Sequence, residues 1–194
     1  MSLWNFVTDF GDTAVTLPLW ALMVAFLAFA GEKRAAVCLA LAVAACGLTI
    51  GIAKLALQSC GRPLLSIELV TPCGHAALAT VVYGSFAYLL GRGAATQRGW
   101  VFAAGTVIIL CIAVSRVALA VHSVSEVIAG VLIGLLALAI FGRAARPLPE
   151  CKSILWLCLP AAALTAVFHG SHWPVEEIVQ NLIRLIRHSV PACA

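Results

Sequence analysis

Long apolar runs separated by short polar connections dominate this chain. The runs lie at residues 13–31, 35–57, 73–91, 99–121, 123–142 and 153–169. A helix can cross the hydrocarbon core of a bilayer when roughly 17–25 predominantly apolar residues follow one another. The pattern therefore predicts an all-α, polytopic membrane bundle of about six transmembrane helices. The last run is the weakest of them, because it is short and contains Pro160.

The final stretch of the chain has a different pattern. Between residues 173 and 188, apolar and polar side chains alternate with helical spacing. One face collects Val175, Ile178, Val179, Leu182, Leu185 and Ile186, and the other Glu176, Glu177, Gln180, Asn181, Arg184 and Arg187. An amphipathic helix of this kind lies in the plane of a membrane interface. We therefore expect a C-terminal interfacial helix over about residues 173–188.

The composition agrees with a bilayer as the main solvent. Of the 194 residues, 63% are hydrophobic and 10% are charged, and the mean hydropathy is +1.07. A soluble domain has about a quarter of its residues charged. The basic residues are scattered, so we expect membrane lipids and no nucleic acid as partners. We expect one membrane-embedded domain over residues 1–194 and predict no particular oligomeric state.

The distribution of charge predicts an orientation. One set of connections carries the basic residues Lys33, Arg34, Arg92, Arg98, Arg143, Arg146 and Lys152. The N-terminal stretch carries Asp9 and Asp12 and no basic residue. Short basic loops stay on the cytoplasmic side of a membrane. The N-terminus, residues 58–72, residues 119–123 and the tail are therefore expected outside. We expect a bacterial inner-membrane protein with these segments facing the periplasm.

Three polar clusters fall at this outer end. They are Lys54 with Arg62-Pro63, then Pro72-Cys73-Gly74-His75, and finally Ser115-Arg116 with His122 and Glu126. Ionisable groups in or beside membrane helices are costly, so each indicates a functional site by default. Lys54, Arg62 and Arg116 are cations that can neutralise a phosphate.

The remaining groups suit phosphoryl transfer. Pro72 favours a helix start, and the free backbone amides of residues 73–75 would bind an anion. His75 and His122 can share the roles of acid and nucleophile. Glu126 lies four residues after His122, on the same helical face, where its carboxylate can orient the imidazole.

Simpler interpretations stand beside this one. Ser123 and Glu126 form a capping-box pattern that would start the fifth helix, a role that can coexist with orienting His122. Lys54 and Arg116 could extend from helix ends to lipid headgroups.

Outside the cations, Cys73 fits a small packing residue better than a nucleophile. Cys60 and Cys73 flank the same polar loop, and we expect free thiols there more than a disulfide. His169, His172 and His188 are interpreted as interfacial.

A continuous helix through Arg116 and His122 would separate the two side chains. Six residues of α-helix turn by about 600°, which places them on different faces. If both contact one phosphate, the chain must break near residues 121–123, and the fifth helix must begin at or just after His122.

The three clusters together resemble a known signature. The pattern is Lys54-x7-Arg62-Pro63, Pro72-Cys73-Gly74-His75 and Ser115-Arg116-x5-His122-x3-Glu126. It resembles the three-part signature of the type 2 phosphatidic acid phosphatase (PAP2) family, and the resemblance covers residues 35–142. Three departures stand out. Seven residues instead of six separate Lys54 from Arg62, Cys73 replaces Ser, and Glu126 replaces Asp.

The resemblance implies roles for these residues. His122 would attack phosphorus and form a phosphohistidine, Glu126 would hold the tautomer of His122, and His75 would protonate the leaving oxygen. The phosphoryl oxygens would be held by Lys54, Arg62, Arg116 and the amides of Cys73 and Gly74. No metal or other cofactor is implied, because the cations neutralise the charge.

The implied activity is a membrane lipid phosphatase. It would hydrolyse a lipid phosphomonoester or pyrophosphate at the outer face, such as undecaprenyl pyrophosphate or a diacyl lipid phosphate. Two alternatives remain: a phosphotransferase that passes the phosphoryl group to another lipid, and a degenerate member that binds or moves a phospholipid without catalysis.

Overall fold

The described part of the chain is helical throughout. A computed structural model describes residues 2–59, 71–93, 95–145 and 156–189, and no strand occurs among these residues. The helices are α1 (Leu3–Asp9), α2 (Thr13–Phe29), α3 (Lys33–Ser59), α4 (Gly74–Gly93), the 3-10 turn η1 (Ala95–Gln97), α5 (Arg98–Ala118), α6 (Val124–Ala144), α7 (Cys158–Phe168) and α8 (Val175–Ser189). The predicted all-α helical bundle is confirmed.

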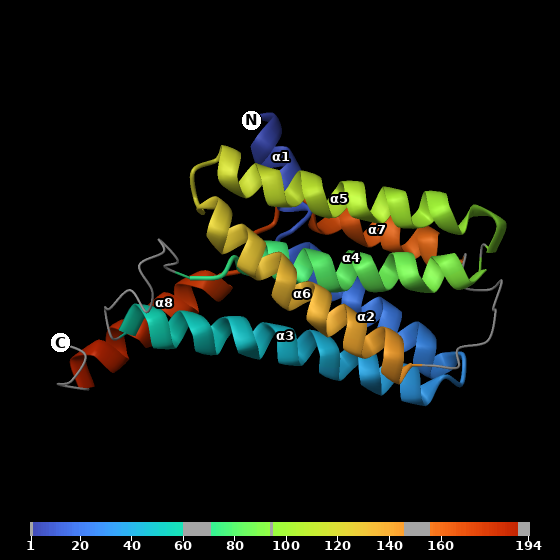
Figure 1. Ribbon diagram of the computed structural model, residues 1–194, viewed down its shortest axis with the longest axis horizontal. Helices are drawn as coiled ribbons and strands as arrows, with labels where there is room; N and C mark the ends of the chain where they lie inside the picture. Colours follow the sequence, from blue (N-terminus) through green and yellow to red (C-terminus); the bar gives the residue numbers. More distant parts are fainter. Residues whose placement is uncertain (1, 60–70, 94, 146–155, 190–194) are drawn as a thin grey trace.

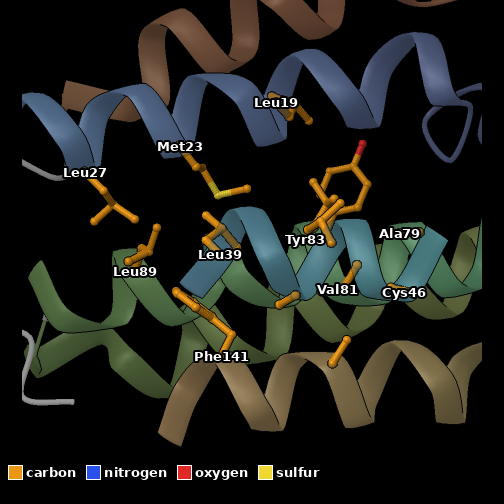
Figure 2. Packing of buried hydrophobic residues seen from close by; sticks show 14 of the residues in the cluster. Leu19, Met23, Leu27, Leu39, Cys46, Ala79, Val81, Tyr83, Leu89 and Phe141 are labelled. Carbon is orange, nitrogen blue, oxygen red and sulfur yellow. The ribbon is translucent and has the colours of Figure 1, made fainter. Parts of the chain in front are cut away.

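Helix α4 occupies the centre of the bundle. It packs against α5 and α6 most extensively, and also against α3 and α2 (Figure 1). Figure 2 shows part of the apolar core, where Met23 and Leu27 of α2 approach Leu39 of α3 and Leu89 of α4. The burial of these side chains holds α4 in a fixed position among its neighbours.

Small residues let α6 approach the start of α4 closely. A Cβ atom at Gly130 would overlap the carbonyl oxygen of Cys73, and one at Gly134 would overlap the carbonyl oxygen of Ala77. Close backbone contact of this kind is the usual role of glycine between membrane helices. It brings the first turns of α4 and α6, which carry two of the predicted clusters, next to each other.

The outer surface of the bundle is apolar. Exposed large side chains include Leu41, Leu48 and Ile52 of α3, Val107, Leu110 and Val114 of α5, and Leu132 and Leu136 of α6. Four segments are long and apolar enough to cross a membrane: Leu3–Phe29, Lys33–Leu57, Arg98–Ala118 and Val124–Ala144. The protein is therefore a membrane protein.

Each predicted apolar run corresponds to a helix. The run at 73–91 forms the central helix α4, which neighbouring helices cover. The weakest run, 153–169, forms the 11-residue helix α7, and its first residues lie outside the described part. α7 packs beside α2.

The polar clusters gather at one end of the bundle. α3 ends there, α4 begins there, and the α5–α6 connection and α8 lie there too (Figure 1). The basic residues Lys33, Arg34, Arg92, Arg98 and Arg143 belong to the helix termini at the opposite end. The predicted amphipathic helix corresponds to α8, whose Ile178, Leu182 and Leu185 are exposed.

Candidate active site

A cavity of about 530 Å³ collects most of the predicted site residues. Six of the eight line it, and they come from four different helices and the α5–α6 connection: Lys54, Gly74, His75, Arg116, His122 and Glu126. Cys73 is fully buried directly before Gly74. Arg62 and Cys60 lie outside the described residues, and Cys73 has a free thiol.

The chain breaks between Arg116 and His122, as the spacing required. α5 ends at Ala118, Ala120 adopts a left-handed conformation with φ of 54°, and α6 begins at Val124. The His122 amide donates back to the carbonyl oxygen of Arg116 at 3.3 Å. This tight turn returns the chain so that both side chains reach the same cavity.

Glu126 combines the two roles that the sequence left open. Its amide donates to Ser123 Oγ at 3.3 Å, and its Oε2 accepts the Ser123 amide at 2.9 Å, which completes a capping box at the start of α6. The same Oε2 lies 3.0 Å from His122 Nδ1, and Oε1 accepts the Thr71 amide at 2.9 Å. The carboxylate is therefore fixed by three groups and holds one ring nitrogen of His122.

The surroundings of His122 favour its protonated form. Contact with the Cys73 thiol is the largest effect that raises the pKa of His122 above 6.5, and the Glu126 carboxylate adds to it, whereas burial acts in the opposite direction. Since Glu126 occupies Nδ1, Nε2 is the nitrogen left to act as nucleophile or base. When the ring is neutral, its Nδ1–H donates a hydrogen bond to the Glu126 carboxylate, and Nε2 carries the lone pair.

Cys73 joins α4 to α6 through its backbone. Its amide donates to the carbonyl oxygen of Glu126 at 3.0 Å. That N–H is used between the two helices in this structure, and the assignment of the Cys73 amide to a phosphoryl oxygen stays a prediction. Gly74, in the cavity wall at the first position of α4, keeps the predicted place of an anion donor. The Cys73 side chain packs against His122.

Two cations face the cavity from different helices. Lys54, near the end of α3, is only 7% exposed although it is charged. Arg116, in the last turn of α5, is half-buried, and its Nη1 donates to Thr8 Oγ1 at 3.0 Å. Burial at the cavity disfavours the interpretation that these side chains extend to lipid headgroups. An anion in the cavity would be within the field of both.

Several neighbours of the site were not predicted. Asp12 Oδ2 lies 3.7 Å from His75 Nε2 and 3.5 Å from His172 Nδ1. Trp173, Val175, Val179 and Gln180 add a wall from α8 and the residues before it. Asp12 is an acid at the edge of an apolar run, and that feature alone could have marked it.

The tail contributes more than an interfacial helix. His172 was interpreted as interfacial, yet it faces Asp12 beside the site. His169 Nε2 lies 3.0 Å from the Phe6 carbonyl oxygen, away from the cavity. The side chain of His188 lies outside the described part. Among the residues described, no group of three or more His, Cys, Asp or Glu is arranged to hold a metal ion.

Comparisons with known proteins give the same family as the signature. Residues 35–148 match the PAP2 superfamily. The chain is also 29% identical to a Klebsiella pneumoniae protein named "Uncharacterized 22.5 kDa protein in cps region", over 92% of this chain and 89% of the relative. No solved structure matches. The family match covers more than half of the chain and contains every predicted site residue, so this protein belongs to the PAP2 superfamily.

Proposed function

We propose that this protein is a lipid phosphatase that works through a phosphohistidine at His122. Membership of the PAP2 superfamily supports a phosphatase-type, lipid-related activity. The observation that carries the proposal is the joining of two histidines, two cations and a helix N-terminus in one cavity. The carboxylate held on His122 Nδ1 gives that ring the arrangement of an oriented nucleophile.

The reaction would proceed in two displacements. His122 Nε2 attacks phosphorus, the bond between phosphorus and the lipid oxygen breaks, and His75 gives its proton to that oxygen. The lipid product leaves. Water then loses a proton to His75 and attacks phosphorus, the P–N bond breaks, and phosphate leaves with His122 regenerated.

Charge stabilisation would come from the cavity wall. Lys54 and Arg116 face the space where the equatorial phosphoryl oxygens would lie, and the Gly74 amide points from the start of α4. Preorganised cations and amides lower the barrier because they need no reorganisation during the reaction. Arg62, outside the described residues, is proposed as a third cation.

The position of the cavity suggests how a lipid would reach it. The cavity lies at the end of an apolar bundle, beside α8, whose exposed Ile178 and Leu182 can enter a membrane interface. A lipid phosphate held in the headgroup layer would then reach the histidines without leaving the membrane. The positions of the basic residues support an outward, periplasmic cavity in a bacterial inner membrane.

The substrate is proposed as undecaprenyl pyrophosphate or a diacyl lipid phosphate. The test is phosphate release by purified protein from undecaprenyl pyrophosphate, phosphatidylglycerol phosphate, phosphatidate and lipid A. At least one should release phosphate in wild type and none in His122→Ala. Binding without release in wild type would favour the non-catalytic alternative, and transfer of phosphate to an added lipid alcohol would favour the phosphotransferase.

Adding EDTA to the same phosphate-release assay tests which groups neutralise the charge of the phosphate. EDTA should leave phosphate release unchanged, since Lys54 and Arg116 are proposed to neutralise the phosphate. Loss of release with EDTA and recovery with magnesium would contradict the assignment of charge neutralisation to these side chains.

A further inference from the structure

The two carboxylate oxygens of Asp12 have different partners, one in helix α2 and one beside the cavity. Oδ1 accepts the Ala14 amide at 2.8 Å and caps α2. Oδ2 points to the histidines, 3.7 Å from His75 Nε2. The residue is 9% exposed. The cap explains Oδ1 and leaves Oδ2 without a structural role in α2.

His75 sits in a strongly charged environment. Around it lie Lys54 on α3 and Arg116 on α5, and His122 and Glu126 line the same cavity. A second cavity of about 300 Å³ shares His75, Asp12 and Arg116 with the first, and its wall also contains Asp9, His172 and Glu177. Burial is the largest effect that lowers the pKa of His75, and Arg116 and Lys54 lower it further, whereas the Asp12 carboxylate opposes this by favouring the protonated ring. A general acid must carry that proton when the leaving oxygen departs.

We propose that Asp12 is a positioning residue that orients His75 toward the leaving oxygen and stabilises its proton-bearing form. This role rests on the proposed phosphatase function. Asp12 would serve His75 as Glu126 serves His122, so each histidine has its own carboxylate. With Nε2 turned toward Asp12, Nδ1 is the nitrogen left to give a proton to the leaving oxygen. The separation of 3.7 Å is longer than a hydrogen bond, so the pair acts through charge and closes when substrate binds.

The signature does not contain Asp12, because the residue precedes the matched region. It belongs to the start of α2, and the fold alone brings it to the start of α4. Gly11, directly before Asp12, lets this segment lie close to α5, since a Cβ atom there would overlap the Ile112 side chain.

The test is Asp12→Asn, which separates the cap from the charge. Asn caps helices as well as Asp does, so α2 and thermal stability should be kept. Turnover of an alkyl or lipid phosphate, which has a poor leaving group, should fall ~10- to 100-fold, less than the ~10²–10⁴ that a general acid supplies, because His75 itself remains. Turnover of p-nitrophenyl phosphate, whose leaving group needs no acid, should stay within ~3-fold of wild type.

His172→Gln is the matched control, because His172 also faces Asp12 Oδ2. The His172→Gln variant should keep the wild-type ratio between the turnover of the alkyl or lipid phosphate and the turnover of p-nitrophenyl phosphate. An equal loss on both substrates in Asp12→Asn would overturn the role, and so would a His172→Gln variant that reproduces the Asp12→Asn ratio. Absence of turnover and of phosphoenzyme in wild type would instead overturn the proposed function, and this role with it. If the wild type turns over both substrates and Asp12→Asn loses both rates equally, the role of Asp12 is refuted while the proposed phosphatase function stands.

Discussion

The surroundings of His122 and His75 differ in rigidity. His122 lies between α5 and α6 with its Nδ1 3.0 Å from a carboxylate that two backbone amides also hold. His75 lies on α4 with its nearest described carboxylate contact at 3.7 Å, and that contact is shared with His172. A fixed ring suits an attacking atom that must be aligned with phosphorus. A looser ring suits a group that moves a proton between a leaving oxygen and water.

His122→Ala should have the largest effect. Without the attacking nitrogen no covalent intermediate can form, so turnover should fall on the order of 10⁴-fold or more on every substrate. Phosphate release measured with good and poor leaving groups checks this. His169→Ala, a histidine that contacts the Phe6 carbonyl away from the cavity, serves as the control and should keep wild-type rates. Retained turnover in His122→Ala would end the assignment of the nucleophile.

His75→Ala should have a large but selective effect. Loss of the acid should slow poor leaving groups by ~10²–10⁴ and good ones far less. A series of aryl phosphates of increasing phenol pKa measures this, and the dependence of rate on leaving group should steepen. If all members of the series lost activity equally, His75 would act in binding and not as the acid.

Glu126→Gln should lower turnover ~10- to 100-fold and also change the pH profile, as removal of an orienting partner does at other histidine sites. Gln retains the capping-box pattern, so α6 should still begin at Val124. Attack requires neutral His122, whose pKa is raised in part by Glu126. Wild-type activity should therefore decline as pH falls through a value above 6.5. That decline should move to lower pH in Glu126→Gln, and an unmoved decline would contradict the pairing.

Gly130→Ala tests whether the spacing of α4 and α6 matters. The added methyl group would overlap the Cys73 carbonyl, so the variant should lose ~1–3 kcal/mol of unfolding free energy through overpacking. Gly99→Ala, where a Cβ atom meets nothing within 4 Å, is the control and should lose none. Thermal unfolding in detergent measures both, and equal midpoints would show that the close approach is not required.

Cys73→Ser should have the smallest effect. Ser keeps the size and restores the residue that the family signature has, while the thiol that raises the pKa of His122 is removed. The low-pH decline should move down, and turnover above it should stay within ~3-fold, typical of a near-isosteric change. A loss as large as that of Glu126→Gln would mean that the thiol takes part in the reaction.

The sequence predicted the helices well, because the bilayer sets their length. The run at 13–31 became Thr13–Phe29, and the run at 99–121 became Arg98–Ala118. The break before α6 was also predictable, since Arg116 and His122 cannot share a face of one helix. These predictions use spacing within a single segment.

What the sequence missed depends on contacts between distant segments. Asp12 meets His75 only after α2 packs beside α4, and Val179 reaches the cavity only because α8 lies against the end of α3. The contact of the Cys73 amide with the Glu126 carbonyl was missed for the same reason, since that carbonyl belongs to another helix. The spacing of apolar and polar residues within one segment does not predict such contacts between segments.

The most direct test is to trap the phosphoenzyme. Wild-type protein is mixed with a ³²P-labelled lipid phosphate, quenched in alkali within one turnover, and digested for mass spectrometry. The account predicts one phosphoryl group on the His122 ring, stable in alkali and labile in acid, and none in His122→Ala. Turnover without a labelled His122, or a label on Cys73 or another residue, would contradict it.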